Sequence, residues 1–485
     1  MKKLLFFVLF PFIGFGQTQI GADINGEFLG DESGIKLSLS NDGNILAIGA
    51  NKNDGNGSNS GSVRVYQNVS GTWTQLGADI NGEAASNQSG FGLELSSNGD
   101  FLAIGARVNI ASTGHVRVYQ NISGTWTQVG VDIDGEESNS QSGYSVSFSD
   151  DGSILAIGAL LNDGNGVDSG HVRVYQNISG TWTQVGVDIN GESAGNRSGT
   201  SVSLSSDGTI LAIGAKKNTG NGVDSGHVRV YRNISGIWTQ LGSDINGEAA
   251  GDESGASVSL SSDGTTLAIG SPLNDGVMSN DTGQVRVYKN ISNSWVQLGA
   301  DINGEAFARS GESVSLSSDG TILAIGSPYN SVNGFNSGSV KVYQNILGTW
   351  TPIGVNINGE AAEDNSGSNV SLSSNGAILA IGSPLNDGNG IDSGSVRVYN
   401  LSSILDNNSF VMANFSVYPN PASEQVTISL EEGLLLEKVN VYTILGQLLK
   451  TEKSNVILVN SLEKGNYIFE VITNKGKASK KILIK

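Results

Sequence analysis

A repeated unit constrains the fold of this chain more than any other feature. The tetrapeptide Leu-Ala-Ile-Gly occurs seven times, with one spacing of 53 residues and five of 56. A fixed period of this length indicates a solenoid, a propeller or another array of repeats. The seven copies begin at Leu46, Leu102, Leu155, Leu211, Leu267, Leu323 and Leu379.

Each unit predicts four short strands. Ser-Val-Ser-Leu-Ser alternates polar and apolar residues, Ile-Leu-Ala-Ile-Gly is continuously apolar, and Val-Arg-Val-Tyr alternates again. A fourth strand begins at a tryptophan in the first six units. Turn sequences rich in Asn, Asp and Gly separate the strands. Four strands in each of seven units predict an all-β fold with a seven-bladed β-propeller.

The two ends of the repeat array complement each other. The seventh unit stops after Val396–Tyr399 and lacks its tryptophan strand, whereas Gln19–Glu27 copies Gln75–Glu83 almost letter for letter. We therefore expect the N-terminal strand to complete the last blade, which would leave no open sheet edge. The tryptophans at the outermost strands are expected to lie between blades.

The pattern changes along the chain predict four segments. Residues 1–16 have the two lysines and the apolar run of a secretory signal peptide, and this run is too short to span a membrane. Residues 17–400 form the propeller and residues 401–413 a linker. Residues 414–485 contain short alternating strands, which predict a small β-sandwich. We expect no transmembrane segment.

Charge separates the two main segments. Residues 17–409 carry 16 Lys and Arg against 39 Asp and Glu, a net charge of −23, whereas residues 410–485 carry 9 against 7. An acidic body argues against nucleic acid as a partner. It permits cations, neutral glycans or basic proteins, although acidic residues also serve solubility. The chain has no cysteine, which excludes disulfides and thiolate metal sites.

Acidic loops are expected to gather on one face of the propeller. Strands in a blade alternate in direction, so the loops between second and third strands emerge on the same face as the loops between blades. Two interpretations stay open: a ligand face that uses calcium, or turn residues that also solvate the loops. Apart from this calcium, no cofactor is expected. The candidate residues are Asp163, Asp168, Asp275, Asp281, Asp387 and Asp392.

The only histidines occupy one position of the repeat in three adjacent units. They are His115, His171 and His227. Equivalent positions in neighbouring blades are too far apart to share one zinc ion, whose ligands lie about 2 Å away. We therefore expect solvated residues at the start of a strand.

The repeat resembles the FG-GAP units of integrin α-subunits and, more closely, their bacterial counterparts. The residues that carry the resemblance are Gly270–Pro272, Gly326–Pro328 and Gly382–Pro384, with Phe91-Gly92 as a literal Phe-Gly pair. The resemblance covers residues 17–400 and implies a seven-bladed propeller. The calcium loops of integrins are not matched, because the corresponding link is only Ser-Asp-Gly and offers too few oxygen ligands.

The C-terminal segment resembles a type A sorting domain of type IX secretion. It has a Tyr-Pro-Asn-Pro motif, a Gly-Asn-Tyr-Ile-Phe-Glu-Val block and a basic end. The resemblance implies export through the periplasm to the outer-membrane surface or the medium, with the secretion machinery as a partner. The motif residues are Tyr418, Pro419, Asn420, Pro421, Lys480, Lys481 and Lys485.

These features predict a secreted or cell-surface protein that binds an extracellular glycan or protein, for example in adhesion. We predict that it is not an enzyme, because the repeat units are nearly interchangeable and no motif for nucleophilic or metal-dependent hydrolysis occurs. Two alternatives stay open. One is a structural component of a surface layer, and the other is a propeller enzyme such as a lyase or glycosidase.

Overall fold

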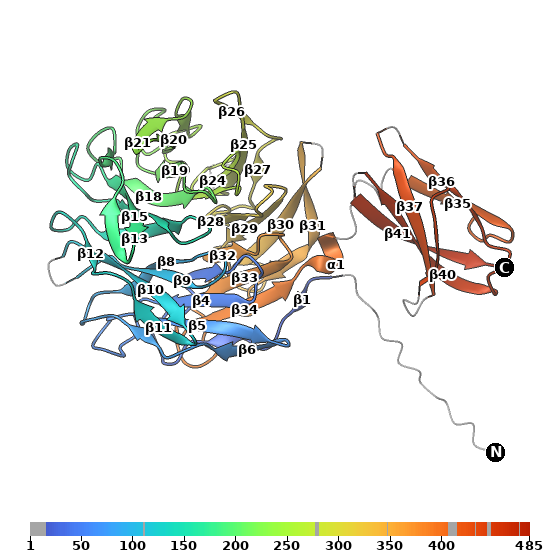
Figure 1. Cartoon of the computed structure of the whole chain (residues 1–485), viewed down its shortest axis with the longest axis horizontal. Helices are drawn as coiled ribbons and strands as arrows, with labels where there is room; N and C mark the ends of the chain where they lie inside the picture. The colour runs from blue at the N-terminus through green and yellow to red at the C-terminus, as the bar shows by residue number, and fades with distance from the viewer. Residues whose placement is uncertain are drawn as a thin grey trace, which may run out of the picture. The chain divides into compact units, whose positions relative to one another are not determined.

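The computed structural model describes residues 16–109, 112–276, 281–346, 348–405, 415–431, 433–443, 448–474 and 476–485. Except for Gly16, the predicted signal peptide lies outside these residues. The described chain consists of antiparallel strands and one short helix, which confirms the all-β prediction (Figure 1). In these ranges, no helix is long and apolar enough to cross a membrane. The chain forms two compact units, of which one spans Gln19–Asn400.

The larger unit contains seven antiparallel sheets in its described residues, one for each sequence repeat. The innermost strands are β3 (Lys36–Leu39), β8 (Ser89–Leu95), β13 (Ser142–Phe148), β18 (Ser198–Leu204), β23 (Ser257–Leu260), β28 (Ser313–Leu316) and β32 (Asn369–Leu372). The second strands are β4 (Ile45–Ala50), β9 (Phe101–Ala106), β14 (Ile154–Ala159), β19 (Ile210–Ala215), β24 (Thr266–Ser271), β29 (Ile322–Ser327) and β33 (Ile378–Ser383).

The outer half of each sheet begins with a longer third strand. The third strands are β5 (Ser62–Val69), β10 (His115–Ile122), β15 (His171–Ile178), β20 (His227–Ile234), β25 (Gln284–Ile291), β30 (Ser339–Ile346) and β34 (Ser395–Asn400). The fourth strands are β6 (Thr72–Gln75), β11 (Thr125–Gln128), β16 (Thr181–Gln184), β21 (Ile237–Gln240), β26 (Ser294–Gln297) and β31 (Thr349–Asn358). Short strands that pair with the third strands are β2 (Ile24–Asn25), β7 (Ile80–Asn81), β12 (Ile133–Asp134), β17 (Ile189–Asn190), β22 (Ile245–Asn246) and β27 (Ile302–Asn303).

The innermost strands follow one another in a closed order. Each contacts the innermost strand of the next sheet, and β3 contacts both β8 and β32 (Figure 1). At the ends of these strands, a closed series of backbone hydrogen bonds runs from sheet to sheet. In the described chain its members are Asn41, Ser97, Asp150, Ser206, Ser262, Ser318 and Ser374, each N–H donating to the carbonyl of the next and Ser374 donating to Asn41.

The last sheet combines strands from both ends of the unit. Its order is β1 (Thr18–Gln19), β34, β33 and β32, and β2 also pairs with β34. The Ile20 N–H donates to the Val398 carbonyl at 2.7 Å, and Ile24 lies opposite Val396. The N-terminal copy of the fourth-strand sequence thus occupies the place that the seventh repeat leaves open.

The core of this unit lies between neighbouring sheets. Val116 and Val118 of β10 pack with Leu155 and Ile157 of β14, and all four are at most 2% exposed. Ala156, which alternates with these two residues, packs with the following sheet instead. Each second strand is therefore covered on both faces, as its continuous apolar run predicts. Burial of each large side chain contributes about 1.5–3 kcal/mol.

Close contact between sheets requires glycine in the second strands. A Cβ atom on Gly214 would overlap the carbonyl oxygen of Gly255 in the next sheet, and Gly255 itself has a φ of +87°. Only glycine permits both this approach and this backbone conformation without strain. A glycine pair of this kind recurs between neighbouring sheets and allows their close approach.

The smaller unit contains two sheets in its described residues. One has the order β35 (Phe415–Tyr418), β36 (Gln425–Leu430) and β39 (Val456–Leu458). The other has the order β38 (Leu448–Glu452), β37 (Leu436–Thr443), β40 (Gly465–Thr473) and β41 (Gly476–Ile484). Their buried residues form one cluster that includes Phe469, Val426 and Val439, each fully buried.

The segment expected to be a linker begins with regular structure. Ser402–Leu405 form α1, a single helical turn in which Ile404 is buried. Leu401, directly before it, is also fully buried. Residues 406–413 of the expected linker lie outside the described residues.

Candidate functional site

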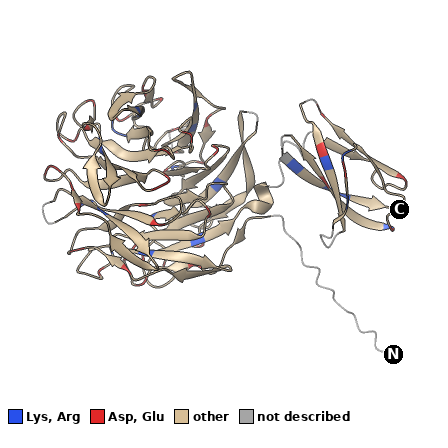
Figure 2. Cartoon of the chain, viewed as in Figure 1, with Lys and Arg blue, Asp and Glu red and all other residues tan. Residues whose placement is uncertain are grey.

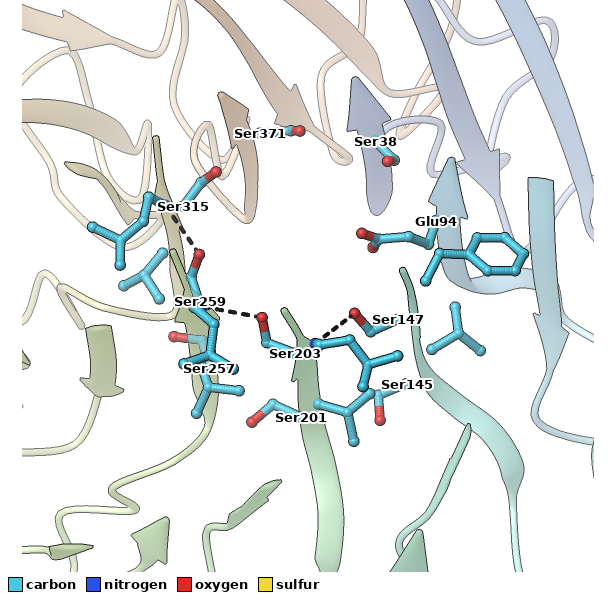
Figure 3. Close-up of a pocket in the computed structure, with 18 of the residues that line it drawn as sticks. Ser38, Glu94, Ser145, Ser147, Ser201, Ser203, Ser257, Ser259, Ser315 and Ser371 are labelled. Atoms are coloured by element: carbon cyan, nitrogen blue, oxygen red, sulfur yellow. Dashed lines mark hydrogen bonds between the residues drawn. The ribbon is translucent and has the colours of Figure 1, made fainter. Parts of the chain in front are cut away.

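The innermost strands of all seven sheets line one pocket of about 300 Å³ (Figure 3). Most of the labelled side chains that line it are serines, which follow from the Ser-Val-Ser-Leu-Ser element of the repeat. Because these strands begin directly after the loops between sheets, their first residues lie at the end of the pocket where those loops meet. The pocket is thus a property of the closed arrangement and not of any single sheet.

The serine hydroxyls join neighbouring sheets around this pocket. Ser147 Oγ accepts the Leu204 N–H at 3.0 Å, and Ser203 Oγ accepts the Leu260 N–H at the same distance (Figure 3). The same bond recurs at Ser38, Ser259, Ser315 and Ser371. A hydroxyl that accepts a backbone N–H still has its own proton to donate, so this lining can bind hydroxyl groups of a ligand.

Four charged residues line the pocket at positions that are uncharged in the other sheets: Lys36, Glu94, Asp150 and Glu312. Glu94 stands where six other sheets have serine, and its carboxylate points into the pocket (Figure 3). Lys36, the first residue of β3, replaces a position that is Ser, Gly or Asn elsewhere. Glu312 directly precedes β28 at a position that is otherwise uncharged. These charged residues therefore make the pocket lining differ from one sheet to another, which the repeat alone would not do.

Burial changes the protonation of three of these groups. It raises the pKa of Glu94 to about 8, and the nearby Lys36 only partly offsets this effect. Burial lowers the pKa of Lys36, which the charges of Glu312 and Glu94 oppose. Burial also raises the pKa of Glu312, although its side chain faces the open pocket. At neutral pH, Glu94 is therefore a protonated carboxylic acid that can donate a hydrogen bond.

An aromatic group completes one side of the pocket. Tyr144 lines it and packs against Phe91, with ring centroids 4.9 Å apart. The Arg107 guanidinium lies 4.0 Å from the centroid of the Phe91 ring, and its Nε–H donates to Gln88. An aromatic face beside hydroxyls and charged groups suits a small ligand with both polar and apolar surfaces.

Sequence reasoning missed Lys36, Glu94 and Glu312. It treated the repeat units as interchangeable, whereas an alignment of the seven units shows each of these residues as the exception at its position. The information was therefore present in the repeat, but only the structure shows that the three exceptions line the same pocket.

The structure places the predicted acidic residues in turns. Asp163 Oδ1 accepts the Asp168 N–H at 2.9 Å, and Asp387 Oδ1 accepts the Asp392 N–H at the same distance. The corresponding bond from the Asp281 N–H to Asp275 is 3.3 Å long. Among the described residues, the carboxylate and histidine groups that could hold a metal ion do not include these aspartates. Figure 2 shows that many acidic residues of the larger unit lie in loops.

The two kinds of loop that carry this acidity lie together. Asn165, between β14 and β15, donates from its side chain to the carbonyls of Gly191 and Glu192, in the loop that leads to β18. The same contact recurs at Asn221 in the next sheet. The acidic loops therefore gather at the end where the innermost strands begin.

The expectation of solvated histidines is wrong. His115, His171 and His227 are only 1–2% exposed, because the loop between sheets folds over the start of each third strand. Each lies beside two carboxylates of its own, so a metal ion at one histidine would need no second histidine as a ligand. In the described chain, the three groups that could hold a metal ion are Glu83, His115 and Asp132; Glu136, His171 and Asp188; and Glu192, His227 and Asp244.

The Tyr-Pro-Asn-Pro motif lies against the last strand of the smaller unit. The Asn420 side chain donates to the Lys481 carbonyl at 3.0 Å and accepts the Leu483 N–H at 2.9 Å. Lys480 Nζ donates to the Phe415 carbonyl at 2.9 Å, and the Lys485 N–H donates to the Ala422 carbonyl. Tyr418 is half-exposed, and Pro419 and Pro421 flank Asn420. The motif and the basic end thus form one structural element.

Several solved structures are similar to the chain at low sequence identity. A putative 6-phosphogluconolactonase from Bacteroides uniformis has 14% identity and a TM-score of 0.49, and covers 67% of this chain and 85% of its own. A periplasmic gluconolactonase from Pseudomonas aeruginosa has 17% identity and a TM-score of 0.47, with the same coverage. Hydrazine synthase from Kuenenia stuttgartiensis has 14% identity and a TM-score of 0.46, and the match covers 75% of this chain and 94% of that one. These names describe those proteins and not this chain.

The prediction that the protein is not an enzyme is contradicted. It relied on interchangeable repeat units and on the absence of motifs for nucleophilic or metal-dependent hydrolysis. The fold instead brings four non-repeated charged residues to one pocket and places each buried histidine beside two carboxylates that could hold a metal ion. Groups of this kind are typical of enzyme sites.

A comparison with curated proteins finds no match. Residues 416–485 match the family described as the secretion system C-terminal sorting domain, which confirms the predicted type IX sorting domain. The C-terminal unit is therefore an export domain, and the protein is directed to the cell surface or secreted.

Proposed function

We propose that this protein is an exported, seven-bladed β-propeller of FG-GAP type that binds a small, hydroxyl-rich ligand in the pocket lined by its innermost strands. The observation that carries the proposal is the position of Lys36, Glu94 and Glu312, three exceptions to the repeat in a single pocket. The closed order of the sheets supports the blade count, and two facing sheets at the C-terminus support a β-sandwich.

The chemistry of the pocket favours a sugar or a sugar-like molecule. Serine hydroxyls, a protonated Glu94 and the Lys36 ammonium supply donors, while Glu312 supplies an acceptor. Tyr144 offers an aromatic face at the side of the pocket. A volume of about 300 Å³ is at the lower end of small-molecule sites, which suits a monosaccharide.

We also propose that the acidic loops frame the entrance to this pocket and repel anionic ligands. Asp163 and Asp168 lie in loops that contact the loops between sheets, and the innermost strands begin directly after those loops. Neutral or cationic ligands would therefore reach the pocket more readily than anionic ligands of the same size. Adhesion to a surface glycan is one use of such a site.

The proposal is tested by calorimetric titration of the mature chain with a panel of neutral, amino and acidic monosaccharides. At least one neutral or amino sugar should bind. Glu94→Ser, which restores the residue of the other sheets, should abolish binding without loss of thermal stability. The matched control is Glu363→Ser, in an exposed loop. Equal binding by both variants would place the ligand elsewhere.

Acid–base catalysis in the same pocket is a second candidate function. The observation that favours it is the pKa of Glu94, because a carboxyl group protonated up to about pH 8 is suited to act as a general acid. Glu312 would then be the second carboxylate of the site. Release of product from a sugar that binds, with loss of turnover but not of binding in Glu94→Gln, would distinguish catalysis from binding alone.

A further inference from the structure

Three histidines are buried at one repeat position, and two of them have a nitrogen atom without a hydrogen-bond partner in the described chain. They open β10, β15 and β20. Nε2 of His115 and Nδ1 of His227 have no hydrogen-bond partner among the described residues. An unsatisfied buried polar group costs about 1–3 kcal/mol. Such a cost at a repeated position indicates that these nitrogens serve another ligand.

Two carboxylates stand beside each histidine at a distance that is too long for hydrogen bonds. His227 Nδ1 lies 3.7 Å from Glu192 Oε2 and 3.8 Å from Asp244 Oδ2. In each group the ligand atoms lie within 4.8 Å of one another. Three atoms about 4 Å apart surround a point about 2.3 Å from each, which is close to the metal–ligand distances of zinc sites.

The carboxylates are held in place by further residues. In each group the second oxygen of the aspartate accepts a hydrogen bond from a glutamine of the fourth strand: Gln128 at 2.7 Å, Gln184 at 2.8 Å and Gln240 at 2.6 Å. Arg229 Nη1 lies 3.7 Å from Glu192 Oε1, so that Oε2 faces the histidine. Such supporting contacts orient ligands in metal sites.

The following sheet provides an internal comparison. Gln284 occupies the position of the histidines, and its Nε2–H donates to Glu248 Oε2 at 2.9 Å. Asp301 and its partner Gln297 are arranged as in the histidine-bearing sheets. A direct hydrogen bond therefore forms at this position when the residue is glutamine, whereas the imidazoles stay 3.7–4.0 Å from the carboxylates.

Each histidine and its two carboxylates lie where two neighbouring sheets meet, and we call these three places the joints. We propose that each joint binds one zinc ion, or a similar divalent transition metal, through one imidazole nitrogen and two carboxylates. Imidazole nitrogen suits these metals, whereas calcium and magnesium take oxygen ligands. The glutamate belongs to the loop that follows the preceding sheet, and the histidine and aspartate belong to the next sheet. A bound ion would therefore cross-link neighbouring sheets. Water would fill the remaining coordination position.

The test uses the full chain and Zn²⁺ alone, with stoichiometry from equilibrium dialysis and cobalt spectra as a second readout. We expect three ions per chain and an increase in melting temperature on addition of Zn²⁺. Each of His115→Gln, His171→Gln and His227→Gln should lose one ion, and the triple variant should lose all three. Glutamine is the native residue at this position in the next sheet, so these variants are expected to fold.

Gln284→His is the matched gain-of-site variant, because its sheet already has both carboxylates. It should bind a fourth ion. The proposal is overturned if the chain binds no Zn²⁺ at micromolar concentrations, or if the triple variant binds as many ions as the natural chain. Cobalt spectra without a nitrogen-ligand signature would overturn it as well.

Discussion

The pocket and the joints between sheets are built from the same repeat, yet they use charge in opposite ways. Between the sheets, charged residues recur, as Asp244 and Glu192 do beside His227, and the neutral Gln240 holds Asp244 by a hydrogen bond. In the pocket, Lys36, Glu94 and Glu312 each occur once among uncharged equivalents. Repeated charge therefore lies where neighbouring sheets meet, whereas charge that departs from the repeat lies in the pocket that the innermost strands share.

The largest expected effect on stability comes from a substitution at a close contact between two sheets. Gly214→Ala places a Cβ atom against the Gly255 carbonyl of the next sheet and should destabilise the fold by about 3 kcal/mol. Gly236→Ala is the comparison, because Gly236, unlike Gly214, has a positive φ but no atom within 4 Å of the added Cβ, and it should cost about 1 kcal/mol. Urea unfolding would measure both. A cost of Gly214→Ala no larger than that of Gly236→Ala would contradict the close approach of the two sheets at Gly214.

A smaller effect is expected at the tryptophans. The Trp182 indole N–H donates to the Val129 carbonyl of the preceding sheet at 3.1 Å, and its ring packs with residues of both sheets. Trp182→Ala should cost about 2–3 kcal/mol, at the lower end for large aromatic residues because the ring is half-exposed. Trp182→Phe keeps the ring and should lose about 1 kcal/mol with the hydrogen bond. Thermal unfolding would separate the two contributions.

In the pocket, we predict that Glu94 makes the stability of the fold depend on pH. The folded-state pKa of Glu94 is raised to about 8, so between pH 4.5 and 8 the folded state binds a proton that the unfolded state releases. The natural chain should therefore lose stability as pH rises through this window. Glu94→Gln should remove this loss and be about 2 kcal/mol more stable than the natural chain at pH 9, after allowance for water in the pocket. A constant difference from pH 4 to 9 would contradict the assignment.

The smallest effects are expected in the acidic loops. The Asp163 carboxylate accepts the Asp168 N–H, so Asp163→Asn should weaken this turn by about 0.5–1 kcal/mol. Asp168 contributes its backbone N–H to the same bond and has a positive φ that asparagine tolerates. Asp168→Asn should therefore change stability by less than about 0.5 kcal/mol. Calcium titration of both variants would show whether the carboxylates have a further role.

The strands were predictable because each repeat contains a complete local pattern. The apolar run of the second strands predicts burial on both faces, and Leu155, Ala156 and Ile157 are all buried. The matching sequences at Gln19–Glu27 and Gln75–Glu83 predicted a partner for the last repeat, and Ile24 does lie opposite Val396. The short strands such as β17 were not predicted, because two residues are too few for a periodic pattern.

The candidate sites depend on distances between sheets, which periodicity does not contain. Lys36, Glu94 and Glu312 are 58 to 276 residues apart in sequence and meet only because the sheets close around one pocket. The burial of His171 arises from the loop that ends the previous repeat, so a reading of each unit by itself places it in solvent. The repeat predicts the strands of each sheet, whereas the candidate sites form only where residues of several sheets meet.

The hydrogen bond between Ile20 and Val398 makes two distant parts of the polypeptide depend on each other. Loop closure over such a separation is slow compared with the pairing of adjacent hairpins, so the final sheet is expected to form late in folding. Until then the exposed edge of β34 can accept a strand from another molecule. The pairing of β34 with β1 and β2 therefore also protects the folded protein from strand exchange between copies.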